Sequence, residues 1–308
     1  MAAQQIAQAH YQAQQAVVRS IVDQGQTLWA TVRAADVLDS WLAALDTIIQ
    51  ILTLGQRAAA SLSQPYVAAV AREQGVPQLG AGVVNPGAFA GVAADGRDLR
   101  SLLMQPALRA LGLLAVGVDD QLALRSGLAR LTRILETETT DAGRVADGVG
   151  MVANRRFVSY VRMLTPPSCG RCIVLAGRAY SWSTGFARHP NCDCYHLPIP
   201  EGSPERLLVQ SPREAFDGMS REQQNRAFGK SAAEAIRDGG DIAQVVNARR
   251  RGATYVAGGR EYTREGTTRR GLYGAGREPR PTPEQIYRDA AGDRGKAIGQ
   301  LRRFGYLI

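Results

Sequence analysis

Apolar residues recur at every third or fourth position along the first 72 residues, the spacing that is typical of amphipathic helices. The pattern runs from Ile6 to Val22 and again from Leu28 to Arg72. Its members include Val17, Val18, Ile21, Val22, Leu38, Trp41, Leu42, Leu45, Ile48, Ile49 and Leu52. We therefore predict two long helices with a break near Asp36–Asp39, where Asp39 or Ser40 would cap the second helix.

A long loop is expected after these helices. Residues 75–96 are rich in Gly, Pro and Ala and lack a helical period, so they predict a hinge or a contact arm. Helical spacing resumes over residues 99–114 and 122–135, and a further helix is predicted over residues 141–164. Thr165-Pro166-Pro167 should end that helix, because proline cannot donate to the helical ladder.

Three sites beyond the prolines carry the signals of short helices. Ser211-Pro212 and Thr282-Pro283 each place a capping side chain before a proline at the first helical position, and Ser220 with Gln223 resembles a capping box. Apolar spacing within residues 286–308 predicts a packed helix near the end of the chain, with Arg302 and Arg303 facing solvent.

The formal charge of +9 belongs to the second half of the 308-residue chain. Residues 1–150 have a net charge of −2 and residues 151–308 a net charge of +11. The first residues lack the basic and apolar regions of a secretory signal, and no run reaches the roughly 18–20 apolar residues of a membrane span. We expect a globular protein that is made and kept in a cytoplasm, with no membrane partner.

All four cysteines lie within 26 residues, as Cys169-Gly-Arg-Cys172 and Cys192-Asp-Cys194. Two of the three histidines, His189 and His196, stand beside the second pair. Two close pairs of thiolates can complete the tetrahedral coordination that zinc favours. Two disulfides or a redox-active CxxC are the alternatives, but disulfides persist mainly in oxidising compartments.

The preferred ligands are Cys169, Cys172, His189 and Cys194. Cys192 can replace Cys194, and His196 is the weakest of the six candidates. Four protein ligands leave no position for water, so the predicted zinc is structural rather than catalytic.

The same segment resembles the signature of the phage Mu F-like minor head proteins. The resemblance rests on the string Cys169-x-x-Cys172-x-x-Leu175-x-Gly177-x-x-Tyr180 and on His189-Pro190-Asn191-Cys192-Asp193-Cys194. Asp193 stands where the family usually has arginine. Residues 245–252 and 263–271 look like segments of the Mu F-like proteins that are carried by tailed phages of actinobacteria.

The resemblance implies a head-morphogenesis protein, present in a few copies near the portal vertex inside the procapsid. Such a protein takes part in assembly, genome packaging or delivery. It would contact the portal or the major capsid protein, occupy the virion interior, and reside in the host cytoplasm during assembly.

Some relatives of this kind are described as capsid maturation proteases, which makes a protease the alternative function. The sequence has no GxSxG elbow. His189 and His196 accompany the cysteines, and His10 lies in a predicted helix. We therefore predict no catalytic residues. A toxin-like effector enzyme is a third reading, for which the C-terminal segment is too short.

The C-terminal segment is basic. From Arg249 to the end, 14 Lys and Arg stand against 6 Asp and Glu, with tyrosines interleaved. Residues 249–280 are rich in Gly, Arg and Thr and predict an extended arm or a hairpin. This arm could bind the packaged DNA through its phosphates or dock on an acidic protein surface. The candidate contact residues are Arg249, Arg250, Arg251, Arg269 and Arg270.

The predicted fold class is mainly α with a small α+β zinc-knuckle module. Residues 1–165 would form a helical domain with a hinge or loop at about 75–97. Residues 166–248 would form the Mu F-like metal-binding module, and residues 249–308 the basic arm and C-terminal helix.

Overall fold

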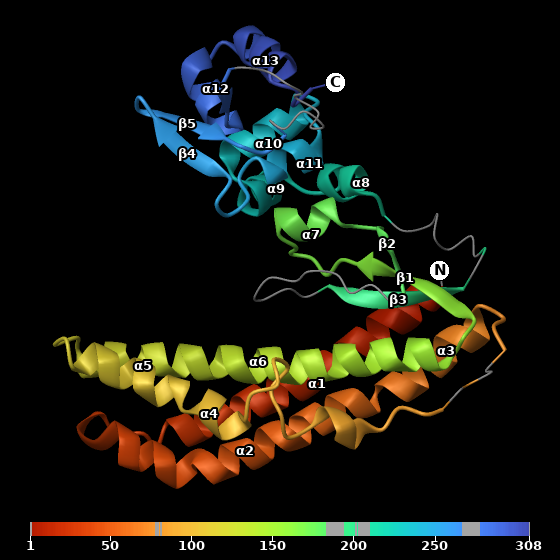
Figure 1. The fold of residues 1–308 in the computed structure, drawn as a ribbon, viewed down its shortest axis with the longest axis vertical. Coiled ribbons are helices and arrows are strands. Elements are labelled where there is room, and N and C mark those ends of the chain that lie inside the picture. Colours follow the sequence, from red (N-terminus) through yellow and green to blue (C-terminus); the bar gives the residue numbers. More distant parts are fainter. Residues whose placement is uncertain are drawn as a thin grey trace. The chain divides into compact units, whose positions relative to one another are not determined.

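The computed structural model describes residues 2–77, 80, 82–182, 194–200, 202, 210–266 and 278–307. They belong to two compact units, shown in Figure 1. Unit 1 is Met1–Val161 with Ala179–Leu207, and unit 2 is Arg162–Arg178 with Leu208–Ile308. Most described residues are helical and the sheets are small, which confirms the mainly α prediction.

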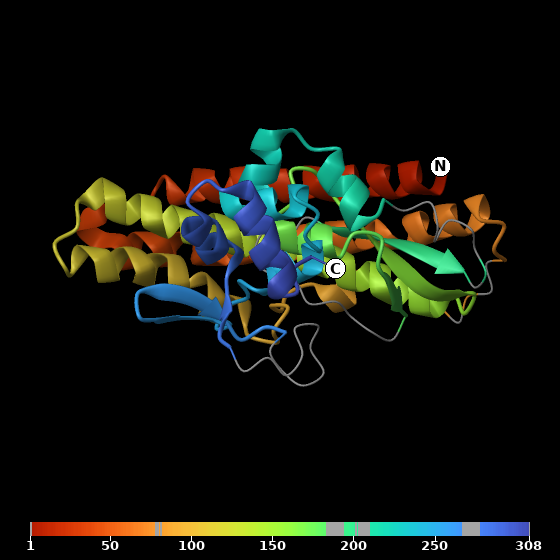
Figure 2. The same ribbon diagram turned by 90° about the horizontal axis from the view of Figure 1, so that it is seen from above.

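Unit 1 is built on long helices. They are α1 (Ala2–Trp29), α2 (Val37–Ser61), α3 (Ser63–Glu73) and α6 (Asp120–Ala153). Shorter elements are η1 (Ala34–Asp36), η2 (Pro86–Phe89), α4 (Leu99–Leu103) and α5 (Gln105–Leu114). α6 packs against α1, α2, α3 and α5, and it lies beside α1 in both views (Figures 1 and 2).

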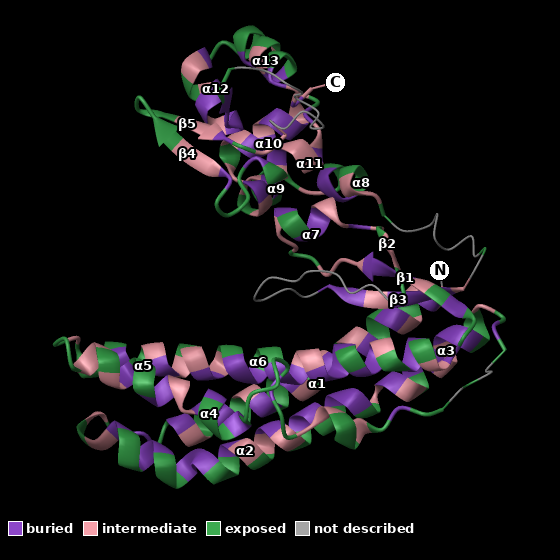
Figure 3. Cartoon of the chain, viewed as in Figure 1, coloured by how far each residue is buried: buried purple, intermediate pink, exposed green. Residues whose placement is uncertain are grey.

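The core of unit 1 follows the predicted apolar stripe of α2. Trp41, Leu45, Ile48 and Leu52 are fully buried, and Figure 3 shows buried stripes along the bundle helices. Each such side chain contributes about 1.5–3 kcal/mol on burial. The ring of Trp41 lies edge-on to Trp29 at 5.0 Å.

α2 also lies in the part of the chain that could span a membrane by length and composition. Among the described residues a single stretch, Ala34–Glu73, passes that test. Its Trp41–Leu52 stripe packs in the core of the bundle.

The start of α2 differs from the prediction. α1 continues to Trp29 and the break covers residues 30–36, so both Asp39 and Ser40 lie inside α2. The Ser40 hydroxyl donates to the Asp36 carbonyl at 2.8 Å and accepts from the Arg33 N–H at 3.1 Å. Neither predicted residue caps the helix.

The two helices predicted over 122–135 and 141–164 are right in part, since residues 122–135 and 141–153 are helical, but they belong to one helix and the second does not reach residue 164. One 34-residue helix, α6, covers the first and ends at Ala153. Strand β1 (Phe157–Met163) follows it. Residues 136–140 are polar and interrupt the apolar spacing, but Thr139 is buried in the bundle and the helix continues through it. The aromatic and β-branched residues of β1 suit a strand, and Tyr160 stacks on Tyr180 of the paired strand at 5.5 Å.

β1 is the middle strand of a three-stranded sheet with the order β2-β1-β3. Its neighbours are β2 (Ala179–Ser181), which pairs antiparallel, and β3 (Tyr195–Pro200). β3 packs on α1 and α6. The Tyr66 hydroxyl of α3 donates to the His196 carbonyl, and the side-chain amide of Gln74 donates to the Pro198 carbonyl at 3.0 Å.

Unit 2 consists of short elements around its own core. They are α7 (Gly170–Val174), α8 (Pro212–Asp217), α9 (Arg221–Phe228), α10 (Lys230–Arg237), α11 (Ile242–Asn247), β4 (Thr254–Ala257), β5 (Arg260–Thr263), β6 (Arg280–Pro281), α12 (Pro283–Ala290) and α13 (Arg294–Arg303). The strands form an antiparallel sheet in the order β4-β5-β6.

The capping and hairpin signals of the sequence agree with the structure of unit 2. Ser211 and Ser220 each form a capping box, and the Thr282 hydroxyl accepts from the N–H of Gln285. Strands β4 and β5 form the hairpin that was one of two predictions for residues 249–280. α13 is the predicted packed helix, and Arg302 and Arg303 are exposed on it.

Candidate functional site

The first cysteine pair lies at the start of α7. Cys169 is the N-cap residue and Cys172 is the third residue of the helix. Positions three apart lie on one side of a helical turn, so the local fold places both thiols on the same side of α7. Cys172 is buried and Cys169 is partly exposed, and neither forms a disulfide. This geometry suits two ligands of one metal ion.

The second half of the predicted metal site is only partly described. Cys194 is buried directly before β3 and forms no disulfide, whereas His189 and Cys192 lie outside the described residues. The described residues contain no group of three or more His, Cys, Asp or Glu side chains that could hold a metal. The thiolate donors are those that zinc selects, and the ligand set stays a prediction.

His196, the weakest ligand candidate, occupies a different setting. It lies on β3, its ring packs against Tyr160 with the centroids 4.7 Å apart, and its carbonyl accepts from Tyr66. Its role in the described structure is to pack the sheet against α3.

Two of the candidate contact arginines already have acidic partners. Arg249 pairs with Glu284 at 3.1 Å, and Arg250 pairs with Glu265 at 2.7 Å. Burial raises the pKa of Glu284, and the charge of Arg249 opposes that shift. Exposed pairs are worth about 0.2–1 kcal/mol, so a phosphate or carboxylate of a partner could replace the internal acid.

Arg251 is the candidate that stays open to a partner. It is exposed, and no ion pair to it is found among the described residues. Arg269 and Arg270 lie outside the described residues. Two tyrosines of the hairpin, Tyr255 and Tyr262, stack on each other at 5.6 Å instead of each presenting a separate face to bases.

A serine, a carboxylate and a histidine do meet inside unit 1. The Ser63 hydroxyl donates to Asp147 at 2.6 Å, and His10 Nε2 lies 3.0 Å from both carboxylate oxygens. The side-chain amide of Gln14 donates to Asp147 at 3.2 Å. In a nucleophilic triad the serine donates to the histidine, whereas here it donates to the acid.

This cluster is closed to solvent. His10, Gln14, Ser63 and Asp147 are all buried, and the ring of Tyr66 stacks on His10 at 4.0 Å. Burial raises the pKa of Tyr66 well above its usual range. Because α1, α3 and α6 each contribute, the cluster acts as a polar link within the bundle.

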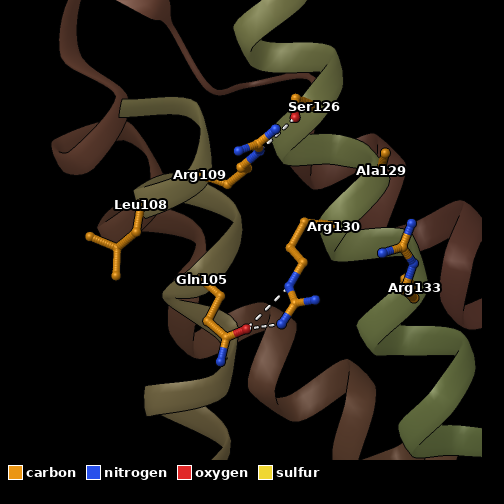
Figure 4. A pocket seen from close by; sticks show the side chains of 7 residues that line it. All are labelled: Gln105, Leu108, Arg109, Ser126, Ala129, Arg130 and Arg133. Atoms are coloured by element: carbon orange, nitrogen blue, oxygen red, sulfur yellow. Dashed lines mark hydrogen bonds between the residues drawn. The ribbon is translucent and has the colours of Figure 1, made fainter. Parts of the chain in front are cut away.

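A second feature, which no motif in the sequence predicts, is a groove between α5 and α6. It has a volume of about 550 Å³ and is lined by three arginines, Arg109, Arg130 and Arg133, together with Gln105 and Ser126 (Figure 4). The arginines are separated by up to 24 positions in the sequence, and helix packing brings them together. Only a local excess of arginine could have indicated the groove.

No protein-family model, curated protein or solved structure matches the chain.

Proposed function

We propose that the chain is a minor head protein of a tailed phage, similar to the Mu F-like proteins. It would act near the portal in procapsid assembly, genome packaging or delivery. The observation that carries the proposal is the string of Cys169, Cys172 and His189-Pro190-Asn191-Cys192-x-Cys194. The helical fold with a short α7 that begins at the CxxC pair is compatible with it.

We further propose that this segment is a zinc knuckle within a small α+β module. Cys169 and Cys172 supply two ligands from one helical turn, and His189 with Cys194 or Cys192 completes the set. A structural zinc ion binds only where its ligands are deprotonated and in place. Its binding therefore stabilises the fold of the cysteine segment. The ion would have no open position for a substrate.

The partners in this proposal are the portal and the major capsid protein. Arg251 and the exposed ion pairs of Arg249 and Arg250 can meet acidic side chains of such a partner. Packaged DNA is the other partner for these arginines. Binding to DNA should weaken steeply between about 50 and 200 mM salt, because it releases counterions.

No feature of the described residues favours the protease alternative. The buried cluster of Ser63, Asp147 and His10 has the wrong order of hydrogen bonds and no access for a peptide. The assignment therefore goes to a structural role in the head.

The test is co-expression with the portal and major capsid proteins of a phage that encodes this chain, followed by sedimentation of procapsids. The proposal predicts that the intact chain co-sediments with procapsids. A matched set of variants compares Arg251→Gln with Arg221→Gln, which is exposed on α9; only the first should weaken incorporation.

Two results would contradict the proposal. One is a chain that stays at the top of the gradient while procapsids form normally without it. The other is cleavage of the capsid protein by the purified chain that a single serine substitution stops, which would establish the protease instead.

A further inference from the structure

The arginine groove of unit 1 is independent of the cysteine segment and of the proposed head function. Arg109 comes from α5, and Arg130 and Arg133 come from consecutive turns of α6. Figure 4 shows Arg109 reaching across to Ser126 and Arg130 reaching back to Gln105. Three cations from two helices therefore share one concave surface.

The described contacts of these arginines are neutral. Arg109 Nε donates to the Ser126 hydroxyl at 3.0 Å, and Arg130 Nε donates to the Gln105 side-chain oxygen at 3.1 Å. A guanidinium has five N–H donors, so most donors of both residues remain available. Arg133 makes no hydrogen bond or ion pair with any residue that the structure describes.

The lack of a nearby acid costs free energy. Like charges that share a groove repel each other, and no lining residue is acidic. Elsewhere in unit 1, Arg100 pairs with Asp46, and Arg144 with Asp141 at 3.6 Å. An external anion bound in the groove would offset the repulsion between these arginines.

The dimensions of the groove indicate the class of anion. Sites for single small ligands are about 300–1,000 Å³, and this groove has about 550 Å³. An acidic peptide carries at most one charge per residue, about 3.3 Å apart. A polyphosphate concentrates several charges in the same space and offers the oxygens that match guanidinium forks.

We propose that the α5–α6 groove binds a compact polyphosphate anion, of the inorganic or nucleoside polyphosphate class. Arg130 and Arg109, held by Gln105 and Ser126, fix the two sides of the site. Arg133 supplies the third cation at its edge. The bound anion replaces the missing carboxylates and draws α5 and α6 together.

The experiment is calorimetric titration of the full chain with inorganic tripolyphosphate and with ATP at about 0.15 M salt, where exposed charges are screened beyond about 8 Å. The variants are Arg133→Gln and Arg130→Gln. The control is Arg125→Gln, an exposed arginine of α6 outside the groove. Arg133→Gln loses no described contact, so the fold of this variant should be intact.

The expected result is a Kd for tripolyphosphate that rises about tenfold in each groove variant, as expected when about 1.4 kcal/mol of binding free energy is lost. The Kd should be unchanged in Arg125→Gln. Tighter binding of ATP than of tripolyphosphate by the wild-type chain assigns the nucleoside class, and equal or weaker binding of ATP assigns the inorganic class.

Three results would overturn the proposal. One is no saturable binding of either probe by the wild-type chain. Another is equal weakening by Arg125→Gln, which would show a diffuse charge effect. The third is groove-dependent binding of duplex DNA or of an acidic peptide without binding of tripolyphosphate, which would give the groove a macromolecular partner.

Discussion

Replacing Gly127 on α6 tests the packing of unit 1 most sharply. A Cβ added at Gly127 would lie 2.4 Å from Cζ2 of Trp29 and 3.0 Å from the Pro106 carbonyl. Trp29 cannot move freely, because its indole N–H donates to the Leu124 carbonyl at 3.1 Å and its ring packs on Trp41. The substitution Gly127→Ala therefore forces a shift in the centre of the core.

These contacts determine the expected loss in the free energy of unfolding. Overpacking of this kind costs about 1–3 kcal/mol, and loss of the indole hydrogen bond costs about 1 kcal/mol. Alanine gains up to about 1 kcal/mol of helix propensity over glycine. Gly127→Ala should thus destabilise unit 1 by about 1–3 kcal/mol, a fall in Tm of roughly 2–4 °C per kcal/mol.

Tryptophan fluorescence is the assay, because all three tryptophans of the chain belong to unit 1. The matched control is Gly148→Ala on the same helix, where the added Cβ would have no neighbour within 4 Å. That control should be neutral or stabilising. In a Trp29→Leu background, Gly127→Ala should lower the free energy of unfolding by less, because the effects of substitutions at neighbouring sites are not additive.

Equal stabilisation by Gly127→Ala and Gly148→Ala would refute the reasoning. It would mean that the ring of Trp29 does not lie over Gly127 and that α1 and α6 do not pack as described.

Two further predictions concern buried polar groups. Burial raises the pKa of Glu138, so the protonated form is favoured in the folded state and its contribution to stability is lost as pH rises through the raised pKa. The amide oxygen of Glu138→Gln can still accept from the N–H of Ala94, and the Tm of this variant should rise relative to that of the wild type from pH 4 to pH 7. The control Glu73→Gln, at an exposed site, should show no such rise. A Tm of Glu138→Gln that falls increasingly below the wild-type value over this range would show that the charge of Glu138 is stabilising. Arg280→Lys should lower the stability of unit 2 by about 3 kcal/mol, since fully buried Arg280 donates to the Phe304 carbonyl at 2.8 Å and lies over Tyr306. Circular dichroism should show this loss with an unchanged tryptophan transition; a shifted tryptophan transition would contradict it.

Local signals in the sequence predicted much of the fold. The apolar period located α1 and α2, and single hydroxyl side chains located the starts of α8, α9 and α12. These features depend on residues within a few positions of one another, so no tertiary information was needed.

The errors arose where tertiary contacts decide the outcome. Residues 136–140 are all polar and interrupt the apolar spacing, but Glu138 and Thr139 are buried in the bundle and α6 continues through them. Residues 157–163 fit a helical period as well as a strand, and pairing with β2 decides for the strand.

The functional features divide in the same way. The pairing of Cys169 with Cys172 is local and visible in the sequence. The link between His10 and Asp147 spans 137 positions, and the arginine groove combines two helices. Net charge was also a poor guide to the C-terminal segment, because Arg249 and Arg250 are matched by acids that only the fold brings near.

We propose above that a structural zinc ion holds the cysteine segment of a phage head protein. The most direct measurement is elemental analysis of the chain purified without chelator, beside the variant Cys169→Ser/Cys172→Ser. The claim predicts about one zinc per wild-type chain, and a variant without zinc whose cysteine segment is readily cleaved by protease. A wild-type chain without metal, equally resistant to protease before and after chelator treatment, would contradict it.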